Sequence, residues 1–302
     1  MAISRAQLAK ELEPGLNALF GLEFGRYENE HSEIYEEESS DRAFEEEVML
    51  GGFSTAPVKS EGGAISFDDA QETYTARYTH ETIALAFSIT EEAIEDNLYD
   101  RLASRYTKAL ARSMATTKQI KAASILNNAF STGANVIGDG VALCSASHPS
   151  LSGTQTNLLA VAADLNETSL EQMLIDIAGF TDERGLKIAV RGTKLIIPKE
   201  LQFIAERVMN SALRSGTSDN DNNAMKNMGM LPEGAVVNHY LTDTDAYFIK
   251  TDAPNGFKYF NRAAIKTAME GDFDTGNMRF KARERYSFGV SDWRCVFGTP
   301  GA

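Results

Sequence analysis

A run of helix-compatible sequence between Thr90 and Phe130 constrains the fold of this chain more than any other feature. Thr90 can cap the helix, and Glu91 and Glu92 in its first turn are favourable near the positive end of the helix dipole. Thr132-Gly133 marks the stop. The predicted helix has about forty residues, whereas helices average roughly 11–12 residues. The fold must therefore contain one long strut.

Two stripes are predicted to run along this helix. The core-facing stripe lies within an arc of roughly 100° and consists of five apolar residues: Leu102, Tyr106, Ala109, Leu110 and Ile120. Beside it, basic residues follow one another at spacings of four, three and four: Arg101, Arg105, Lys108 and Arg112. A basic stripe is usually a solvated helix face, but this one could also bind an acidic segment of this chain or of a neighbour.

The N-terminal part of the chain is strongly acidic. Residues 4–20 predict a short helix that is interrupted at Pro14-Gly15. Between Glu28 and Glu47, ten acidic residues accompany a single Lys or Arg, which is Arg42. The scattered apolar residues there cannot bury a core by themselves. We therefore predict an arm, which is either solvated or ordered on a partner.

The next segment predicts a long β-hairpin. Gly51-Gly52, Pro57 and Gly62-Gly63 are turn signals, which place a glycine-rich tip between two strands. Apolar and small residues alternate over 83–89, as in a half-buried strand. A lone two-stranded hairpin is marginally stable in water, so this one needs a neighbouring surface.

The second half of the chain predicts a mixed unit of helices and strands. Helical spacing covers Glu167 to Phe180, and a strand from Lys187 to Ile197 ends at Pro198, which can open the next helix. Ser215–Asn223 has no large apolar residue and predicts a polar loop. Short strands then recur: Ala235–Tyr240, Tyr247–Thr251, Phe257–Asn261, Ala264–Met269, Met278–Tyr286 and Trp293–Phe297. The predicted class is α+β.

Charge and composition argue against several classes of protein. The net charge of −14 is unfavourable for nucleic-acid binding as the main role, because phosphate contacts need clustered Lys and Arg. Two cysteines, Cys144 and Cys295, are too few for a disulfide framework and fit a protein folded in a reducing cytosol. We expect no membrane span, because no apolar run approaches 18 residues, and residues 1–10 do not resemble a secretory signal.

The sequence predicts no catalytic, cofactor-binding or metal-binding residues. We find no phosphate-binding loop, HExxH or Cys-x-x-Cys motif. Cys144 and His148 lie in Cys-Ser-Ala-Ser-His-Pro, which is compatible with a thiol nucleophile. The simpler interpretation is a structured loop in which His148 bonds to backbone and Cys144 packs. The four histidines share no metal-ligand spacing: His31, His80, His148 and His239.

Three stretches of sequence, taken in order, resemble the Hong Kong 97 fold of tailed-phage major capsid proteins. Leu143-Cys-Ser-Ala-Ser-His-Pro-Ser150, with Gly153 and Asn157-Leu158 after it, resembles the same region of Mu-like major head subunits. Lys194-Leu-Ile-Ile-Pro-Lys-Glu-Leu201 is similar to the entry of the axial domain of that fold. Arg283-Glu-Arg-Tyr-Ser-Phe-Gly-Val-Ser-Asp-Trp-Arg294 is similar to the last strands of its peripheral domain.

This resemblance implies a division of the chain into five parts. Ser215–Asn223 would then lie at the centre of a pentamer or hexamer. Lys59 lies near the tip of the extended loop, where some family members cross-link, but no partner asparagine or catalytic glutamate can be matched, so cross-linking is not expected. The implied parts are an N-terminal arm (1–47), an extended hairpin loop (48–90), a peripheral domain with the spine helix (91–164), an axial domain (165–265) and return strands of the peripheral domain (266–302).

The function implied by the resemblance is that of a shell subunit. Copies would assemble into pentamers and hexamers of an icosahedral head that encloses double-stranded DNA, which the acidic subunit would contact only weakly. A scaffolding protein and a portal are the expected partners, no membrane is involved, and the location is the virion, after assembly in the host cytoplasm. We expect deletion of residues 1–47 to leave a folded subunit that assembles poorly.

Three alternatives remain open at this point. An encapsulin-like nanocompartment shell would share the fold and enclose cargo protein instead of DNA. An intracellular hydrolase would use Cys144 as its nucleophile. A soluble oligomeric binding protein would form only small species, which electron microscopy distinguishes from particles.

Overall fold

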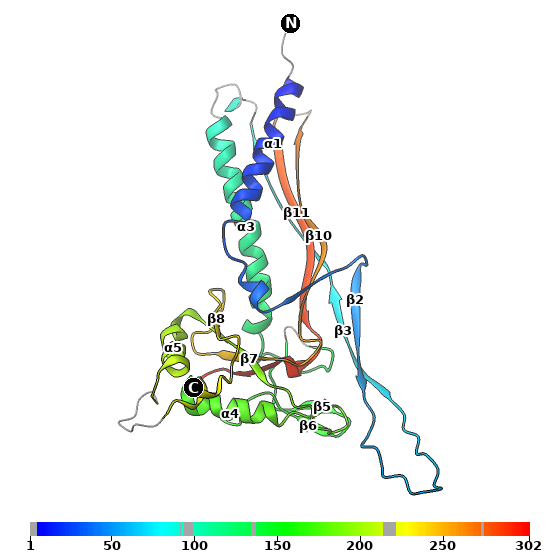
Figure 1. The fold of residues 1–302 in the computed structure, drawn as a ribbon. Coiled ribbons are helices and arrows are strands. Elements are labelled where there is room, and N and C mark those ends of the chain that lie inside the picture. Colours follow the sequence, from blue (N-terminus) through cyan, green and yellow to red (C-terminus); the bar gives the residue numbers. More distant parts are fainter. Residues whose placement is uncertain (1–4, 91, 94–98, 134–136, 214–221, 273–274) are drawn as a thin grey trace.

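The long helix is present as α3 (Tyr99–Asn127) in a computed structural model of the chain (Figure 1). It is shorter than predicted at its C-terminal end, and the start of the predicted helix, with Glu91 and residues 94–98, lies outside the described residues. So does most of the predicted polar loop 215–223. The structure describes residues 5–90, 92–93, 99–133, 137–213, 222–272 and 275–302, with side chains throughout except at 5–13 and 99–102.

The buried face of α3 differs from the predicted stripe. Leu110 is buried as predicted, but Tyr106, Ala109 and Ile120 are exposed, and the side chains of Arg101 and Leu102 lie outside the described residues. The true core face is rotated by roughly a quarter turn, because α3 meets its neighbours through small side chains that carry no signal in a pattern of large apolar residues. That face includes Ala103, Thr107, Leu110, Ala111, Met114, Ala122, Ala123 and Leu126.

Helices α1 (Arg5–Phe24) and α3 lie along a four-stranded sheet (Figure 1). Its strands follow the order β1-β10-β11-β4. β10 (Phe257–Gly271) and β11 (Met278–Val290) form a long antiparallel pair, and β4 (Glu81–Ile89) is antiparallel to β11. β1 (Glu36–Ser39) is parallel to β10. The two strands predicted between 257 and 269 are therefore one strand, whose register shifts twice between Asn261 and Lys266.

A second lobe carries the other four-stranded sheet, in the order β12-β9-β7-β8, and its side chains dominate the largest hydrophobic cluster. The α+β class is therefore confirmed. None of the helices in the described ranges combines the length and apolar character needed to cross a membrane. The remaining elements are η1 (Glu30–Glu33), β5 (His148–Ser150), β6 (Gly153–Gln155), α4 (Glu167–Ala178), β7 (Gly192–Ile197), η2 (Lys199–Leu201), α5 (Gln202–Asn210), α6 (Ala224–Met228), β8 (Ala235–Val237), β9 (Tyr247–Thr251), η3 (Trp293–Cys295) and β12 (Val296–Thr299).

Local chemistry explains where these shorter elements begin. The side chain of Asn166 accepts from the backbone of Ser169 and the Ser169 hydroxyl accepts from the backbone of Asn166, so a capping box starts α4 close to the predicted position. The predicted strand Trp293–Phe297 instead starts as the 3-10 turn η3, because the Asp292 carboxylate caps the backbone of Arg294. The strand β12 begins only after that turn.

The projecting hairpin consists of β2 (Phe44–Gly51) and β3 (Gln71–Thr79), joined by residues 52–70 without regular secondary structure (Figure 1). The prediction differs in two respects. The first strand begins at Phe44, so the predicted boundary between 1–47 and 48–90 falls within β2. The alternating segment 83–89 belongs to β4 in the other sheet, because alternation identifies a strand but not its partner. Only His80 separates β3 from β4.

The N-terminal segment is part of the folded core. Leu16 and Phe20 of α1 are buried against α3 and β11, and Ile34 and Tyr35 belong to the largest hydrophobic cluster. The Tyr35 hydroxyl donates to the carbonyl of Ala122 at 2.7 Å. Deleting residues 1–47 should therefore unfold the subunit, which corrects the expectation that the truncated chain stays folded.

A pair of substitutions in α1 tests this packing. Phe20→Ala should lower the free energy of unfolding by about 3 kcal/mol, because it opens a cavity between Phe24 and Phe280. Leu22→Ala, at an exposed position of the same helix, should change it by less than about 0.5 kcal/mol. Chemical denaturation of unassembled subunits measures both. Equal effects would mean that α1 does not pack as described.

Candidate assembly surfaces

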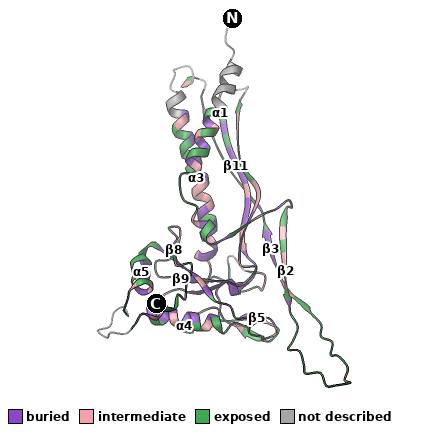
Figure 2. Ribbon diagram, in the orientation of Figure 1, coloured by how far each residue is buried: buried purple, intermediate pink, exposed green. Residues whose placement is uncertain are grey.

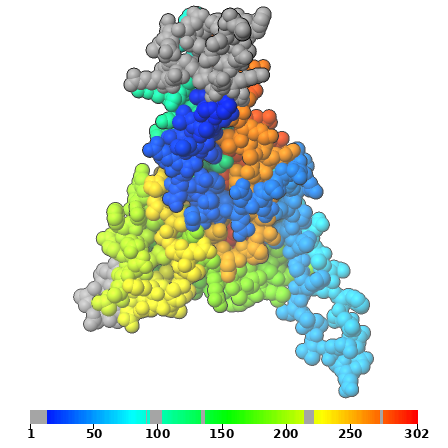
Figure 3. All heavy atoms as spheres, turned by 45° about the horizontal axis from the view of Figure 1, so that its top comes forward, coloured from blue at the N-terminus to red at the C-terminus, as the bar shows by residue number. Residues whose placement is uncertain are grey.

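Residues 52–70 at the end of the hairpin, here called the hairpin tip, expose large apolar side chains. Val58 is 100% exposed and Phe67 is 97% exposed, and Phe53 and Ile65 are also exposed (Figure 2). The backbone N–H of Ser54 donates to the Asp68 carboxylate at 2.6 Å and so links the two limbs of the tip. The tip projects away from the body of the subunit (Figure 3). Exposed apolar surface of this kind is typical of a contact site.

A groove of about 700 Å³ runs along the exposed face of α3, where it meets α1. Four cations line it, Arg26, Arg105, Lys108 and Arg112, together with the carboxylate of Glu23. Exposed Ala109 and Ile120 provide an apolar floor. This groove of α3 therefore combines positive charge with exposed apolar area on a rigid helix.

The acidic segment is ordered on its own chain, but mostly not on the basic stripe. The Glu33 carboxylate lies 2.9 Å from Lys194 Nζ, and the Glu30 carboxylate accepts the backbone N–H of His239 at 2.9 Å. Burial lowers the pKa of Lys194, but hydrogen bonds to Glu33 and Glu233 outweigh it and raise that pKa above its ordinary value. The segment thus joins the α3 lobe to the second lobe.

The basic stripe is instead contacted by residues that lie just before the acidic run. Arg112 lies 4.0 Å from Glu23 and donates to the Tyr27 hydroxyl at 2.5 Å, and both partners precede the acidic run of 28–47. Among the ion pairs of the described residues, Arg105 and Lys108 have no partner, so that part of the stripe faces solvent in the subunit.

Lys258 attaches the base of the hairpin to the sheet. Its side chain is only 8% exposed, and its Nζ lies 3.1 Å from Glu38 of β1 and also bonds to Glu47 of β2. The Ser291 hydroxyl donates to the other oxygen of Glu47 and also hydrogen-bonds with the Tyr78 hydroxyl. Burial by itself lowers the pKa of Lys258. Glu47 and Glu38 have the opposite and larger effect, so the pKa lies above its ordinary value and the ammonium stays charged.

Sequence reasoning missed this cluster. The available signal was a lysine inside the aromatic run Phe257-Lys-Tyr-Phe260, where a buried ammonium requires an acidic partner. The aromatic run did not indicate which of the many N-terminal glutamates would be the acidic partner of Lys258.

His80, between β3 and β4, forms a second attachment. Its two ring nitrogens each lie 2.9 Å from a hydroxyl, that of Ser40 after β1 and that of Ser287 in β11. The Ser40 hydroxyl donates to Glu45 of β2 at 2.6 Å. Burial lowers the pKa of His80, so the ring is neutral at physiological pH.

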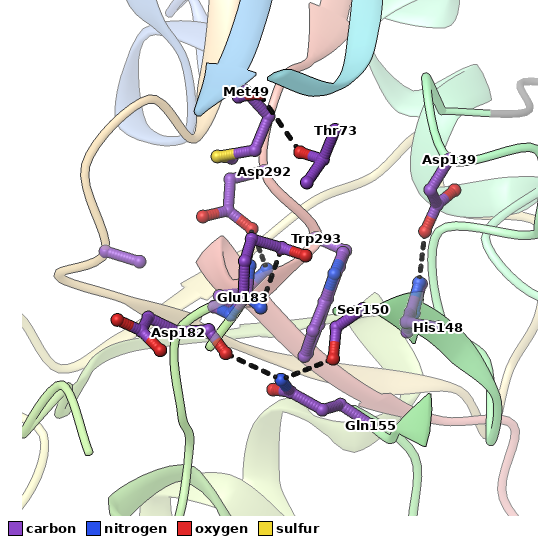
Figure 4. A network of polar contacts seen from close by, with 12 residues as sticks. Met49, Thr73, Asp139, His148, Ser150, Gln155, Asp182, Glu183, Asp292 and Trp293 are labelled. Carbon is purple, nitrogen blue, oxygen red and sulfur yellow. Dashed lines mark hydrogen bonds and ion pairs between the residues drawn. The ribbon is translucent and has the colours of Figure 1, made fainter. Parts of the chain in front are cut away.

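The predicted Cys144–His148 loop is part of the core. His148 stacks on Trp293 with ring centroids 4.3 Å apart (Figure 4). Its ring nitrogens lie 2.6 Å from Asp139 Oδ2 and 3.0 Å from Asn157 Oδ1, so His148 bonds to side chains and the predicted backbone partner is wrong. The Asn157 amide donates to the carbonyls of three further residues: Leu143, Trp293 and Val296.

Cys144 packs in this core, as predicted. Burial raises the pKa of its thiol, whereas a nucleophilic cysteine needs a lowered one. Both nitrogens of His148 are occupied by Asp139 and Asn157. This geometry supports a structural role for the motif. Within the described ranges, no group of three or more His, Cys, Asp or Glu side chains is arranged to hold a metal ion.

Comparison with known proteins gives one family. The family model described as "Phage capsid protein" matches residues 73–298, about three quarters of the chain. No curated protein matches the sequence.

Solved structures share the fold at low identity. A virus-like particle from Pyrococcus furiosus is 9% identical with a TM-score of 0.52, over 94% of this chain and 97% of that one. The capsid of Myoviridae phage XM1 is 11% identical with a TM-score of 0.51, over 89% of each chain. The capsid of a native GTA particle is 12% identical with a TM-score of 0.52, again over 89% of each. The Hong Kong 97 type of fold is therefore confirmed.

Acidification tests the attachment at His80. Because burial lowers the pKa of His80 below 6.5, the unfolded chain binds more protons than the folded one once the pH falls below that value. The stability that His80 contributes is complete above it and is lost as the pH falls towards the folded-state pKa. Glu45, Arg262 and Arg285 also act on this ring.

The measurement is the denaturation midpoint of the subunit between about pH 7.5 and about pH 5. His80→Asn keeps a donor and an acceptor but does not titrate, so its pH dependence should be shallower. His31 is also buried, and burial lowers its pKa as well. Because His31 is present in both proteins, its effect on the pH dependence cancels when the two are compared. Identical slopes for the two proteins would rule out this role of His80.

Proposed function

This chain belongs to the phage capsid protein family, and from that premise we propose that its copies assemble into pentamers and hexamers of an icosahedral head around double-stranded DNA. The family and the fold make it a major capsid protein, and its place is in the virion capsid. The proposal concerns the arrangement of its copies, what they enclose, and the contacts that join them.

The hairpin tip carries the proposal. Its exposed apolar side chains gain free energy only when a second molecule covers them, so the subunit is incomplete by itself. Ordering such a segment costs roughly 2–5 kcal/mol, which keeps each contact weak. Many weak contacts per subunit then add up through multivalency to a stable particle.

The groove of α3 on a neighbouring copy is the surface that best fits the tip. The tip has three carboxylates, Glu61, Asp68 and Asp69, against Lys59. The groove has four cations against Glu23. Both surfaces also expose apolar side chains, and unlike charges on two such surfaces favour one register over others.

The lobes support the assignment of the two domains. We propose that α3 with β4, β10 and β11 forms the peripheral domain and that β7, β8, β9 and β12 form the axial domain. Because β2 starts at Phe44, we place the start of the extended loop there and not at residue 48.

The charge of the chain supports weak contact with the packaged DNA. At −14 the subunit repels phosphate, so DNA would be held without tight binding. A scaffolding protein and a portal would take part in assembly in the host cytoplasm. We propose a structural and not an enzymatic role, which the buried thiol of Cys144 supports.

An encapsulin-like shell is the nearest alternative, because the virus-like particle of Pyrococcus furiosus has a similar fold. Particles that contain DNA and no cargo protein would favour the phage head. Particles that contain a cargo protein and no DNA would favour the nanocompartment.

A matched pair of valines tests the role of the tip. Val58→Ser at the tip should reduce particle formation severalfold, because it removes apolar area that a neighbour buries. Val161→Ser, at a second exposed position, should assemble normally. Electron microscopy and sedimentation measure particles, and both variants should keep the wild-type denaturation midpoint. Normal particles from Val58→Ser with Phe67→Ser would contradict the proposal.

A charge exchange tests the proposed contact between tip and groove. Lys108→Glu should weaken assembly, and Glu61→Lys alone should weaken it as well, because each places like charges opposite one another. The double variant should recover part of the loss, by about 0.5–1 kcal/mol per contact. Additive losses without recovery would place the tip on another surface.

A further inference from the structure

A second groove, which the contacts proposed above do not use, lies at the base of the hairpin and has a volume of about 390 Å³. It joins four parts of the chain that are distant in sequence: β2, the loop around 182–190, the loop around 252–254, and the turn that follows β11. Leu50 is 62% exposed at its edge. The lining residues include Met49, Leu50, Ile188, Val190, Ala253 and Pro254 on the apolar side.

The polar side of this groove has excess negative charge. Asp182, Glu183, Asp252 and Asp292 line it, with Arg294 as the one cation among the lining residues. Figure 4 shows Asp182, Glu183 and Asp292 on one side of Trp293, away from His148 and Asp139. The net formal charge of these five side chains is therefore −3.

Arg294 already makes several contacts on the polar side of this groove. Its guanidinium donates to Asp292 Oδ1 at 3.2 Å, to Glu183 Oε1 at 2.9 Å and to the carbonyl of Thr181 at 2.8 Å, and it stacks on Trp293. These bonds reach one oxygen of Glu183 and one oxygen of Asp292. One arginine thus faces more acid than it can neutralise.

One carboxylate oxygen in particular has no partner. The Glu183 side chain is 3% exposed, and within the described part of the chain its Oε2 accepts no hydrogen bond. An unpaired carboxylate oxygen in a buried position is costly unless a cation or a donor reaches it. Burial also raises the pKa of Asp292 beside it, although Arg294 acts in the opposite direction.

We propose that this groove binds an arginine or lysine side chain, flanked by aliphatic residues, from a separate cationic polypeptide. The ammonium or guanidinium would lie among Asp182, Glu183 and Asp252, and its neighbours would cover Leu50 and Ile188. A second copy of this chain fits less well. With 43 acidic against 29 basic residues, copies alone leave carboxylates unneutralised, whereas a basic partner supplies the missing charge.

The binding of a labelled peptide to full-length subunits tests the proposal. The probe is acetyl-Gly-Leu-Arg-Leu-Arg-Gly-amide with a fluorophore, measured by fluorescence anisotropy in about 50 mM salt. Asp182→Asn with Asp252→Asn should weaken binding by about fivefold, as expected for the loss of two partly exposed ion pairs. Asparagine keeps the Oδ1 acceptors that bind the backbone of Arg184, Leu186 and Arg191, so the loops should stay folded.

The matched control is Glu200→Gln with Glu270→Gln, which removes the same charge at exposed positions away from the groove. It should leave binding within about twofold of wild type, and Leu50→Ser should weaken it. Three results would overturn the proposal: no binding by the wild-type protein, equal losses in both double variants, or subunit self-association that only the groove variant abolishes. Because the proposed head assembly does not need this groove, particle formation by the same variants reports on that function separately.

Discussion

The buried ammonium of Lys258 is the interaction on which the geometry of the hairpin depends. It pairs with Glu38 of β1 and Glu47 of β2 while it lies in β10, so one side chain sets the position of three strands. A buried ion pair adds little net stability because of its desolvation cost, but a buried charge that loses its partner costs about 3–5 kcal/mol. The hairpin therefore leaves the body at a defined place and projects its apolar tip from a rigid base.

That rigidity matters because a shell subunit must present surfaces in fixed directions. The helix α3 and the long pair β10–β11 form a rod, and the acidic segment near Glu33 ties that rod to the second lobe through Lys194. Apolar area that cannot be buried within the subunit remains at the tip and in the groove of α3. The large negative charge opposes premature association of the subunits.

Sequence reasoning identified the elements well and their partners poorly. Helices α3 and α4 and strand β9 lie close to the predicted ranges, since periodicity and capping are local properties, whereas β7 begins at Gly192 and not at Lys187. The core face of α3 was placed on Tyr106 and Ile120, because large apolar residues dominate such patterns, whereas the buried face mixes alanines with a few larger residues such as Met114. The acidic run suggested an arm that is either solvated or ordered on a partner, but Ile34 and Tyr35 within it are buried in the main core of the same chain.

From its sequence alone the chain could be assigned the α+β class, a long helix, a hairpin with a glycine-rich tip and a resemblance to phage capsid proteins. These assignments follow from residue spacing and from local sequence motifs. Only the tertiary structure decided that β4 pairs in another sheet and not in the hairpin, and that Lys258 pairs with Glu38 and Glu47. It also decided that four acidic side chains line one groove: Asp182, Glu183, Asp252 and Asp292. Pairings between residues about two hundred positions apart depend on packing and on charge satisfaction in three dimensions, which no local pattern encodes.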